Sequence, residues 1–311
     1  MDMSTLLSSF GIMTIIILLG FIIARKYKVT AESKQLLIII IIHIAVPSII
    51  LNGIFNTDMN GTTLAKMFMI FLLSIMFNTV GILLGWFSAV IFRFRAIKAK
   101  KIAILSGLGN TGFIGIPLCE RLFGPEGGLL AAIYDAGLDV VAFTLVIVLL
   151  QKNEKFSFRS FKAIMNMPIA AIMIGVSIAI IGYQPPLLIK HLTSTLANLA
   201  APLAMIYIGL LIPEFLKEKK KIPVRFVSLS LIMKLFIIPL LFIMILQIMP
   251  IAVEVKNVVS IQVSMPTFML ATVLFAKYAN DEETAVMITI YSTILSLITV
   301  PLIVYATSLF L

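Results

Sequence analysis

The sequence predicts an all-α integral membrane protein with ten transmembrane helices, arranged as a five-plus-five inverted repeat. Three observations predict this fold class: the composition, the spacing of the apolar segments and the placement of the cations. Of the 311 residues, 61% are hydrophobic and 12% are charged, whereas a soluble domain has about 45–50% apolar and about 25% charged residues. This composition excludes a water-soluble globule, and the single cysteine, Cys119, excludes an intrachain disulfide scaffold.

Ten apolar segments are separated by charge clusters and by turns rich in Pro, Gly and Asn. Several contain 18 or more residues with almost no charge, which is the pattern of a membrane-spanning helix. The first segment is predicted to be a span and not a signal peptide, because Arg25-Lys26 follows it in place of a small-residue cleavage site. The predicted segments are approximately 4–24, 35–55, 64–92, 102–119, 128–150, 164–183, 188–212, 226–249, 257–276 and 284–310.

The basic residues follow the alternation of these segments. Of the 24 Lys and Arg, 19 fall in one set of alternate connections, among them residues 93–101 and the short basic connector 151–163. Only four fall in the opposite set, and Lys234 lies within a span. By the positive-inside rule the first set faces the cytoplasm, so both termini face outward from the cytoplasmic membrane. The net charge of +10 is therefore explained by the orientation of the spans in the membrane, and we predict no nucleic-acid partner.

Ten spans divide into two halves of five, predicted at 1–150 and 151–311. Because five is odd, the second half enters the membrane from the opposite side and is inverted relative to the first. Residues 45–47 and 200–202 both read Ala-x-Pro, at corresponding places in the two halves. The alternative is a chance placement of helix kinks, since proline is common in membrane helices.

The fourth and ninth segments are predicted to be broken helices. Four glycines and a proline fall within residues 106–117, and Pro266 and Thr267 interrupt the ninth segment. A break in the bilayer is tolerated only where it is buried in protein or lines a wet cavity. Its half-helix N-terminus suits an anion, and Asn110 and Thr111 carry groups that bind a carboxylate. The alternative is simple kinking for close helix packing.

A specific resemblance rests on the residues around these breaks. Residues 109–118 (Gly-Asn-Thr-Gly-Phe-Ile-Gly-Ile-Pro-Leu), followed by Leu-Phe-Gly at 122–124, resemble the fourth helix of the auxin efflux carrier family. That family includes bacterial malate and malonate permease-like proteins and the plant PIN auxin exporters. Ala-Val-Pro at 45–47, Met-Pro-Thr at 265–267 and Tyr-Asp at 134–135 resemble it too, so the resemblance covers essentially the whole chain.

The resemblance implies a fold like that of bile-acid symporters and sodium/proton antiporters, in which helices four and nine cross at their breaks. Helices one, two, six and seven would form a scaffold, and helices three to five and eight to ten a transport domain. It also implies alternating-access transport of a small organic anion, such as malate or an auxin-like acid, with the substrate carboxylate on Asn110 and Thr111. Gly109 departs from the family pattern, because the plant carriers have Pro at this position.

Ionisable residues within spans are costly and are functional candidates by default. Asp135 and Asp139 share one face of the fifth segment, where they could bind a coupling proton or sodium ion, or only bond to backbone groups at the break. Lys234 could attract the anion, pair with an acid or extend outward to the interface. Lys234 and His43 are further coupling candidates, although a lone membrane histidine is more often a packing residue.

Several motifs of soluble enzymes are absent, among them the P-loop, HExxH, CxxC and Gly-x-Ser-x-Gly. We therefore predict no enzymatic activity, no cofactor and no metal. An ion-coupled symporter or antiporter of the same fold, and a solute sensor without transport, are the alternatives. The expected partners are the lipid bilayer and the organic anion, and a coupling ion and a homodimer are left open. The predicted substrate site comprises Pro47, Asn52, Gly109, Asn110, Thr111, Asp139, Pro266 and Thr267.

Overall fold

The computed structural model describes residues 3–150, 167–217, 223–279 and 281–308, and their regular elements are all helical. Short π-helical stretches, labelled η, continue several of the α-helices. The elements are α1 (Met3–Lys26), α2 (Ala31–Ile40), η1 (Ile41–Ala45), α3 (Val46–Asn56), α4 (Gly61–Ile91), α5 (Ala96–Gly107), η2 (Thr111–Gly115), α6 (Ile116–Val141), η3 (Ala142–Val146), α7 (Ile147–Leu150), α9 (Met167–Ile180), α10 (Leu187–Ala197), α11 (Ala200–Lys217), α12 (Val224–Ile232), η4 (Met233–Ile237), α13 (Ile238–Ile248), α14 (Val253–Val263), α15 (Leu270–Ala279) and α16 (Glu282–Ser308).

Within the described residues, six helical runs are long and apolar enough to cross a membrane. Four of the ten predicted segments have no run of their own. The first, α1, is not among the six. The fourth is split into α5 and η2–α6, of which the second part belongs to the run Thr111–Leu150, and the ninth is split into α14 and α15. The sixth is represented by α9, which has only 14 described residues. The six runs are Ala31–Asn56, Gly61–Ile91, Thr111–Leu150, Leu187–Pro213, Val224–Ile248 and Glu283–Tyr305.

The run Thr111–Leu150 is itself divided by a kink. Gly124 has φ 72° and ψ −166°, a conformation that side chains rarely adopt, and Pro125 follows it. Proline is favoured at the first position of a helix because its fixed φ is helical and its missing N–H is not needed there. The chain therefore starts a new helix at this point, which accounts for the predicted boundary between the fourth and fifth segments.

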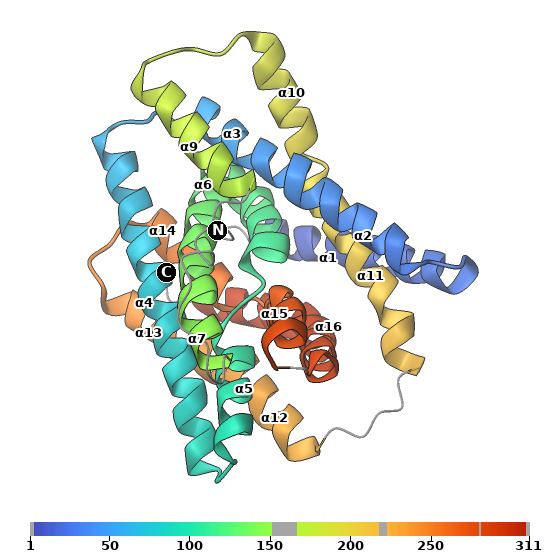
Figure 1. Cartoon of the computed structure of the whole chain (residues 1–311). Helices are drawn as coiled ribbons and strands as arrows, with labels where there is room; N and C mark the ends of the chain where they lie inside the picture. Colours follow the sequence, from blue (N-terminus) through green and yellow to red (C-terminus); the bar gives the residue numbers. More distant parts are fainter. Residues whose placement is uncertain (1–2, 151–166, 218–222, 280, 309–311) are drawn as a thin grey trace.

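The helices pack into two groups (Figure 1). The continuous rod of α2, η1 and α3 crosses α10 and α11, and α1 packs along α11. In the other group, α4 packs on α5 and α6, and α15 lies beside α16. Contacts between α3 and α6 connect the two groups.

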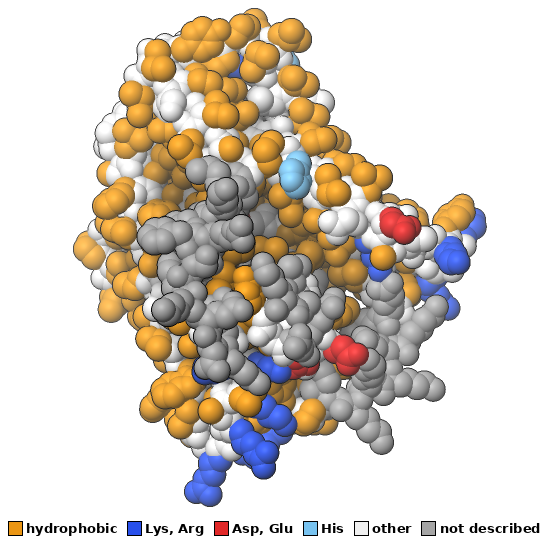
Figure 2. All heavy atoms as spheres, viewed as in Figure 1, with side chains coloured by type: hydrophobic (Ala, Val, Ile, Leu, Met, Phe, Trp, Pro, Cys, Tyr) orange, Lys and Arg blue, Asp and Glu red, His pale blue; other side chains and the backbone are white. Residues whose placement is uncertain are grey.

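The surface has the character of a membrane protein. Figure 2 shows hydrophobic side chains over the upper and left parts of the visible face, with Lys and Arg gathered at its lower end and its right-hand tip. Ile15, Phe68 and Phe87 are among the many large apolar side chains that are exposed. An apolar surface this extensive is stable only when lipid covers it. The predicted basic connector 151–163 lies outside the described residues.

Two glycines allow α1 and α11 to approach each other closely. A Cβ atom at Gly20 would collide with the carbonyl oxygen of Ile206, and a Cβ atom at Gly209 would collide with that of Ile17. Small residues at such positions let the backbones of two membrane helices come into close contact, which stabilises their packing. This contact fixes one wall of the cavity described below.

Candidate functional site

The two predicted breaks meet in the interior of the molecule. Residues 108–110 lie between α5 and η2, residues 264–269 lie between α14 and α15, and Gly109 pairs with Thr267 in an antiparallel bridge. The backbone N–H of Asn110 donates to the carbonyl of Pro266 at 2.7 Å, and that of Phe268 donates to the carbonyl of Leu108 at 3.3 Å. The two unwound segments thus satisfy part of each other's backbone hydrogen-bonding needs at the place where both helices are broken.

Thr267 anchors this crossing to its neighbours. Its hydroxyl donates to the carbonyl of Leu105 at 2.8 Å, and its N–H donates to the Oγ of Ser292 at 3.0 Å. These bonds attach the crossing to the end of α5 and to α16. Although Thr267 was predicted as a substrate ligand, its hydroxyl is already engaged with the protein backbone.

The side chain of Asn110 has a hydrogen-bond donor, Nδ2, for which the described residues provide no acceptor. Its carbonyl accepts hydrogen bonds from the N–H groups of Ile114 at 3.3 Å and Gly115 at 3.2 Å, so its backbone is fully used. Its side chain is only 4% exposed, and its Nδ2 has no hydrogen-bond partner among the residues that the structure describes. A buried donor left in this state costs about 1–3 kcal/mol. A ligand with an acceptor oxygen would recover that free energy.

Thr111 and Asp135 are joined next to Asn110. The Thr111 hydroxyl donates to Asp135 Oδ1 at 2.5 Å. Gly112 leaves room for this carboxylate, because a Cβ atom there would lie only 2.6 Å from Asp135 Oδ2. Asp139 lies four residues further along α6 and is buried. The structure therefore brings Thr111, next to Asn110, together with Asp135. The sequence had instead predicted Asp139 as the acid of the substrate site.

Lys234 lies on the other side of Gly109. It belongs to η4, its side chain is 2% exposed, and a Cβ atom at Gly109 would lie 3.2 Å from its Nζ. No carboxylate of the described residues lies within ion-pair distance of its Nζ. Of the alternatives predicted for Lys234, pairing with an acid and extension to the interface therefore both disagree with the geometry of the described residues. Attraction of the anion stays a prediction.

Two polar residues that were not predicted as site residues share a small cavity with Lys234. Gln262 is buried, its Nε2 donates to the carbonyl of Ala131 at 3.0 Å, and its Oε1 has no partner among the described residues. Asn78 is buried on α4 and donates to the carbonyl of Ser74 at 2.8 Å. Both line the cavity that also contacts Gly109. The sequence signal for Gln262 was a polar residue within an apolar run, one turn before Pro266.

The remaining predicted residues lie away from the crossing. His43 is exposed, and its Nδ1 is 3.2 Å from the carbonyl oxygen of Ile39. Pro47 begins α3, and Asn52 accepts a hydrogen bond from Asn56 at 2.9 Å. None of these three lines either cavity beside the crossing.

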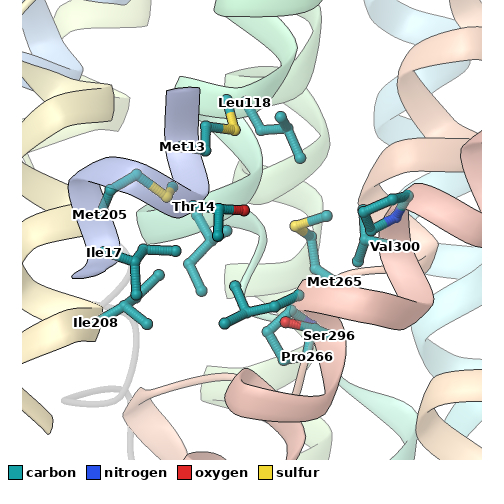
Figure 3. A pocket seen from close by; sticks show the side chains of 13 residues that line it. Met13, Thr14, Ile17, Leu118, Met205, Ile208, Met265, Pro266, Ser296 and Val300 are labelled. Carbon is teal, nitrogen blue, oxygen red and sulfur yellow. The ribbon is translucent and has the colours of Figure 1, made fainter. Parts of the chain in front are cut away.

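A second, larger cavity lies between the two groups of helices (Figure 3). It is bounded by α1, α6, α11 and α16, and Met265 and Pro266 of the crossing form part of its wall. Its open volume is about 40 Å³. This is room for a few water molecules and is smaller than a typical small-molecule site.

Comparison with known proteins identifies the relatives of this chain. A model of the family described as "Membrane transport protein" matches residues 9–304. An uncharacterized transporter of Methanothermobacter thermautotrophicus is 27% identical over 293 residues, which cover 93% of this chain and 94% of that protein. An uncharacterized transporter of Methanocaldococcus jannaschii is 26% identical over 303 residues, which cover 94% of this chain and 95% of that protein. These matches confirm the resemblance predicted from residues 109–118.

Proposed function

The chain belongs to the membrane transport protein family, which is that of the auxin efflux carriers, and on this premise we propose that it is a secondary transporter of small organic anions. It moves them across the cytoplasmic membrane by alternating access and catalyses no reaction. The single observation that supports this most is the buried Asn110 Nδ2, which has no acceptor among the described residues. A carboxylate oxygen is an acceptor of the kind that this donor needs.

Three groups at the crossing favour a negative charge at Asn110. The first is the N-terminus of the helix that begins with η2 at Thr111, which is the positive end of its dipole. The second is Lys234, whose buried Nζ lies on the far side of Gly109 and is positive when protonated. The third is Asn110 Nδ2, because a hydrogen bond to a charged group is worth about 1.5–3 kcal/mol and so strengthens carboxylate binding tenfold to hundredfold.

We also propose the division of the chain into two inverted five-helix halves, 1–150 and 151–311, with both termini on the outer face. The scaffold consists of α1, α2–α3, α9 and α10–α11, and the transport domain consists of α4–α7 and α12–α16. The contacts of α1 with α11, and of α3 with α9 and α10, support this division. So does the crossing itself, which bonds α5 and η2 to the unwound residues of the ninth segment.

The test of the site is Asn110→Ala in proteoliposomes. Because the substitution removes the donor and leaves the backbone bonds of the crossing, we expect at least a tenfold loss of carboxylate uptake with no loss of folded protein. Asn198→Ala is the matched control, since Asn198 is exposed at the end of α10 and lines neither cavity. Uptake by Asn110→Ala equal to that of the control would refute the assignment.

Proton or sodium coupling is the second candidate, and the bond between Thr111 and Asp135 favours it. An ionised Asp135 beside the anion site repels the substrate, whereas a protonated or cation-paired Asp135 does not. Asp135→Asn keeps an acceptor for Thr111 but cannot exchange a proton. We expect wild-type uptake to be stimulated by an imposed proton or sodium gradient and the variant to lose this stimulation.

Asp58→Asn is the control for this experiment, because Asp58 lies exposed in the connection between α3 and α4. If the wild-type protein ignores both gradients, it is a uniporter and the coupling assignment is wrong. A solute sensor predicts a third result, namely binding of the acid to purified protein with no flux in any gradient.

A further inference from the structure

We propose that the turn between α4 and α5, together with the start of α12, binds the phosphate of an anionic phospholipid. Three arginines, Arg93, Arg95 and Arg225, form this site, and the last turns of α4 provide a surface for the acyl chains. The inference does not depend on the proposed function. It requires only a chain that lies in a membrane, which membership of the membrane transport protein family supports.

Arg225 of α12 is bound to the turn from the side. Its Nη2 donates to the carbonyl of Phe92 at 2.6 Å. Its guanidinium lies 5.2 Å from the centre of the Phe94 ring, and Phe94 packs edge to face on Phe226 with ring centres 6.3 Å apart. Arginine has five N–H donors, so these contacts hold the exposed guanidinium in place and leave most of its donors for a ligand.

Arg93 lies between Phe92 and Phe94 in a backbone conformation that favours glycine. Its φ is 54°, and no other non-glycine residue of the described chain has a positive φ. This conformation is unfavourable for a residue with a Cβ atom, and glycine would relieve the cost. Residues held in such conformations cluster at functional sites. Because the side chain of Arg93 is exposed, we assign it a role at the surface.

The protein does not neutralise the positive charge of this turn. The sequence contains no Asp or Glu between Asp58 and Glu120. No carboxylate of the described residues lies within ion-pair distance of Arg93, Arg95 or Arg225. Figure 2 shows Lys and Arg gathered at the lower end of the visible face, where Figure 1 places the α4–α5 turn. Arginine binds phosphate through paired hydrogen bonds, so this cluster favours a phosphate group.

The exposed side of α4 leads directly to these arginines. Its last two turns carry four large exposed apolar side chains, Trp86, Phe87, Val90 and Ile91. Trp86 and Val90 are four residues apart, so they share one face of the helix. Tryptophan is enriched at the level of lipid headgroups. A lipid whose phosphate is bound by the arginines therefore lays its acyl chains along α4, a contact that a soluble phosphate compound cannot make.

Trp86 makes the site directly measurable, because it is the single tryptophan of the chain. Lipids brominated on the acyl chain quench tryptophan fluorescence on contact. We compare quenching in phosphatidylcholine vesicles that contain the same fraction of brominated phosphatidylglycerol or of brominated phosphatidylcholine. One basic residue at an anionic membrane surface strengthens binding about fivefold. For the wild-type protein we expect phosphatidylglycerol to bind at least about fivefold more strongly than phosphatidylcholine.

Arg93→Asn combined with Arg95→Gln tests the site at little cost to folding. Asparagine tolerates a positive φ, and the Arg95 side chain makes no capping hydrogen bond to α5. We expect the two lipids to bind this variant equally, to within about twofold. Arg25→Gln combined with Lys28→Gln is the matched control, because it removes the same charge from exposed residues at the end of α1. The control should keep the wild-type preference.

Arg225→Lys separates a defined site from general attraction to positive charge. The variant keeps the net charge but loses the planar guanidinium on Phe94, so we expect the preference for phosphatidylglycerol to fall about threefold. An unchanged preference in this variant or in Arg93→Asn/Arg95→Gln would overturn the site. An equal loss in the α1 control would also overturn it, because any cation would then serve. Excess soluble glycerol phosphate should leave the quenching unchanged, and competition would overturn the assignment to a lipid.

Discussion

At the scale of single residues, the crossing is built from groups that are expensive to bury. Asn110 Nδ2 and Gln262 Oε1 lack a hydrogen-bond partner among the described residues, and Lys234 forms no ion pair with them. Folded proteins leave few buried polar groups without a partner. Since Asn110 and Lys234 lie on either side of the crossing at Gly109, we infer that a ligand or water completes the site.

Lys234→Met separates stability from function at this point. Removing a buried ammonium that has no counter-charge should leave thermal stability unchanged or raise it. Anion uptake should fall at least tenfold, because the positive charge beside the crossing is lost. Melting temperature in detergent and uptake in proteoliposomes measure the two effects, with Lys98→Met, an exposed position on α5, as the control. A variant that is less stable but equally active would contradict both expectations.

At the scale of elements, the contact of α1 with α11 depends on glycine. Gly209→Ala places a methyl group against the carbonyl oxygen of Ile17. Over-packing of this kind costs about 1–3 kcal/mol, so we expect a lower melting temperature. Gly11→Ala is the matched control on α1, because a Cβ atom there has no neighbour within 4 Å. Equal melting temperatures for the two variants would show that the helices can separate freely.

The sequence predicted which two helices are broken, but not all of the residues that pack beside the breaks. The Gly and Pro content of residues 106–117 and Pro266 predicts two breaks, because these residues weaken a helix wherever they stand. The predicted fourth segment began at 102, whereas α5 begins at Ala96. The reason is that charged residues occupy its first turns, beyond the apolar stretch. Gln262 was not among the predicted site residues, because its place in the small cavity with Lys234 depends on tertiary packing.

At the scale of the whole molecule, three sets of contacts hold the proposed transport domain together. Lys101 pairs with Asp281, between α5 and the turn before α16. Lys66 is 3.1 Å from Glu126 and 3.5 Å from Glu254, which joins α4, α6 and α14. Ion pairs near the surface contribute only about 0–1 kcal/mol each, and these pairs are partly exposed. The buried backbone bonds of the crossing join the two halves directly.

The orientation of the whole molecule can be tested with single cysteines, because Cys119 is buried and gives little background labelling. Lys98 and Tyr183 are both exposed, the first next to the basic α4–α5 turn and the second in the α9–α10 connection. Cations are retained on the cytoplasmic side. A membrane-impermeant maleimide should therefore label Tyr183→Cys in intact spheroplasts and Lys98→Cys only after permeabilisation. The reverse pattern would invert the proposed topology and place both termini in the cytoplasm.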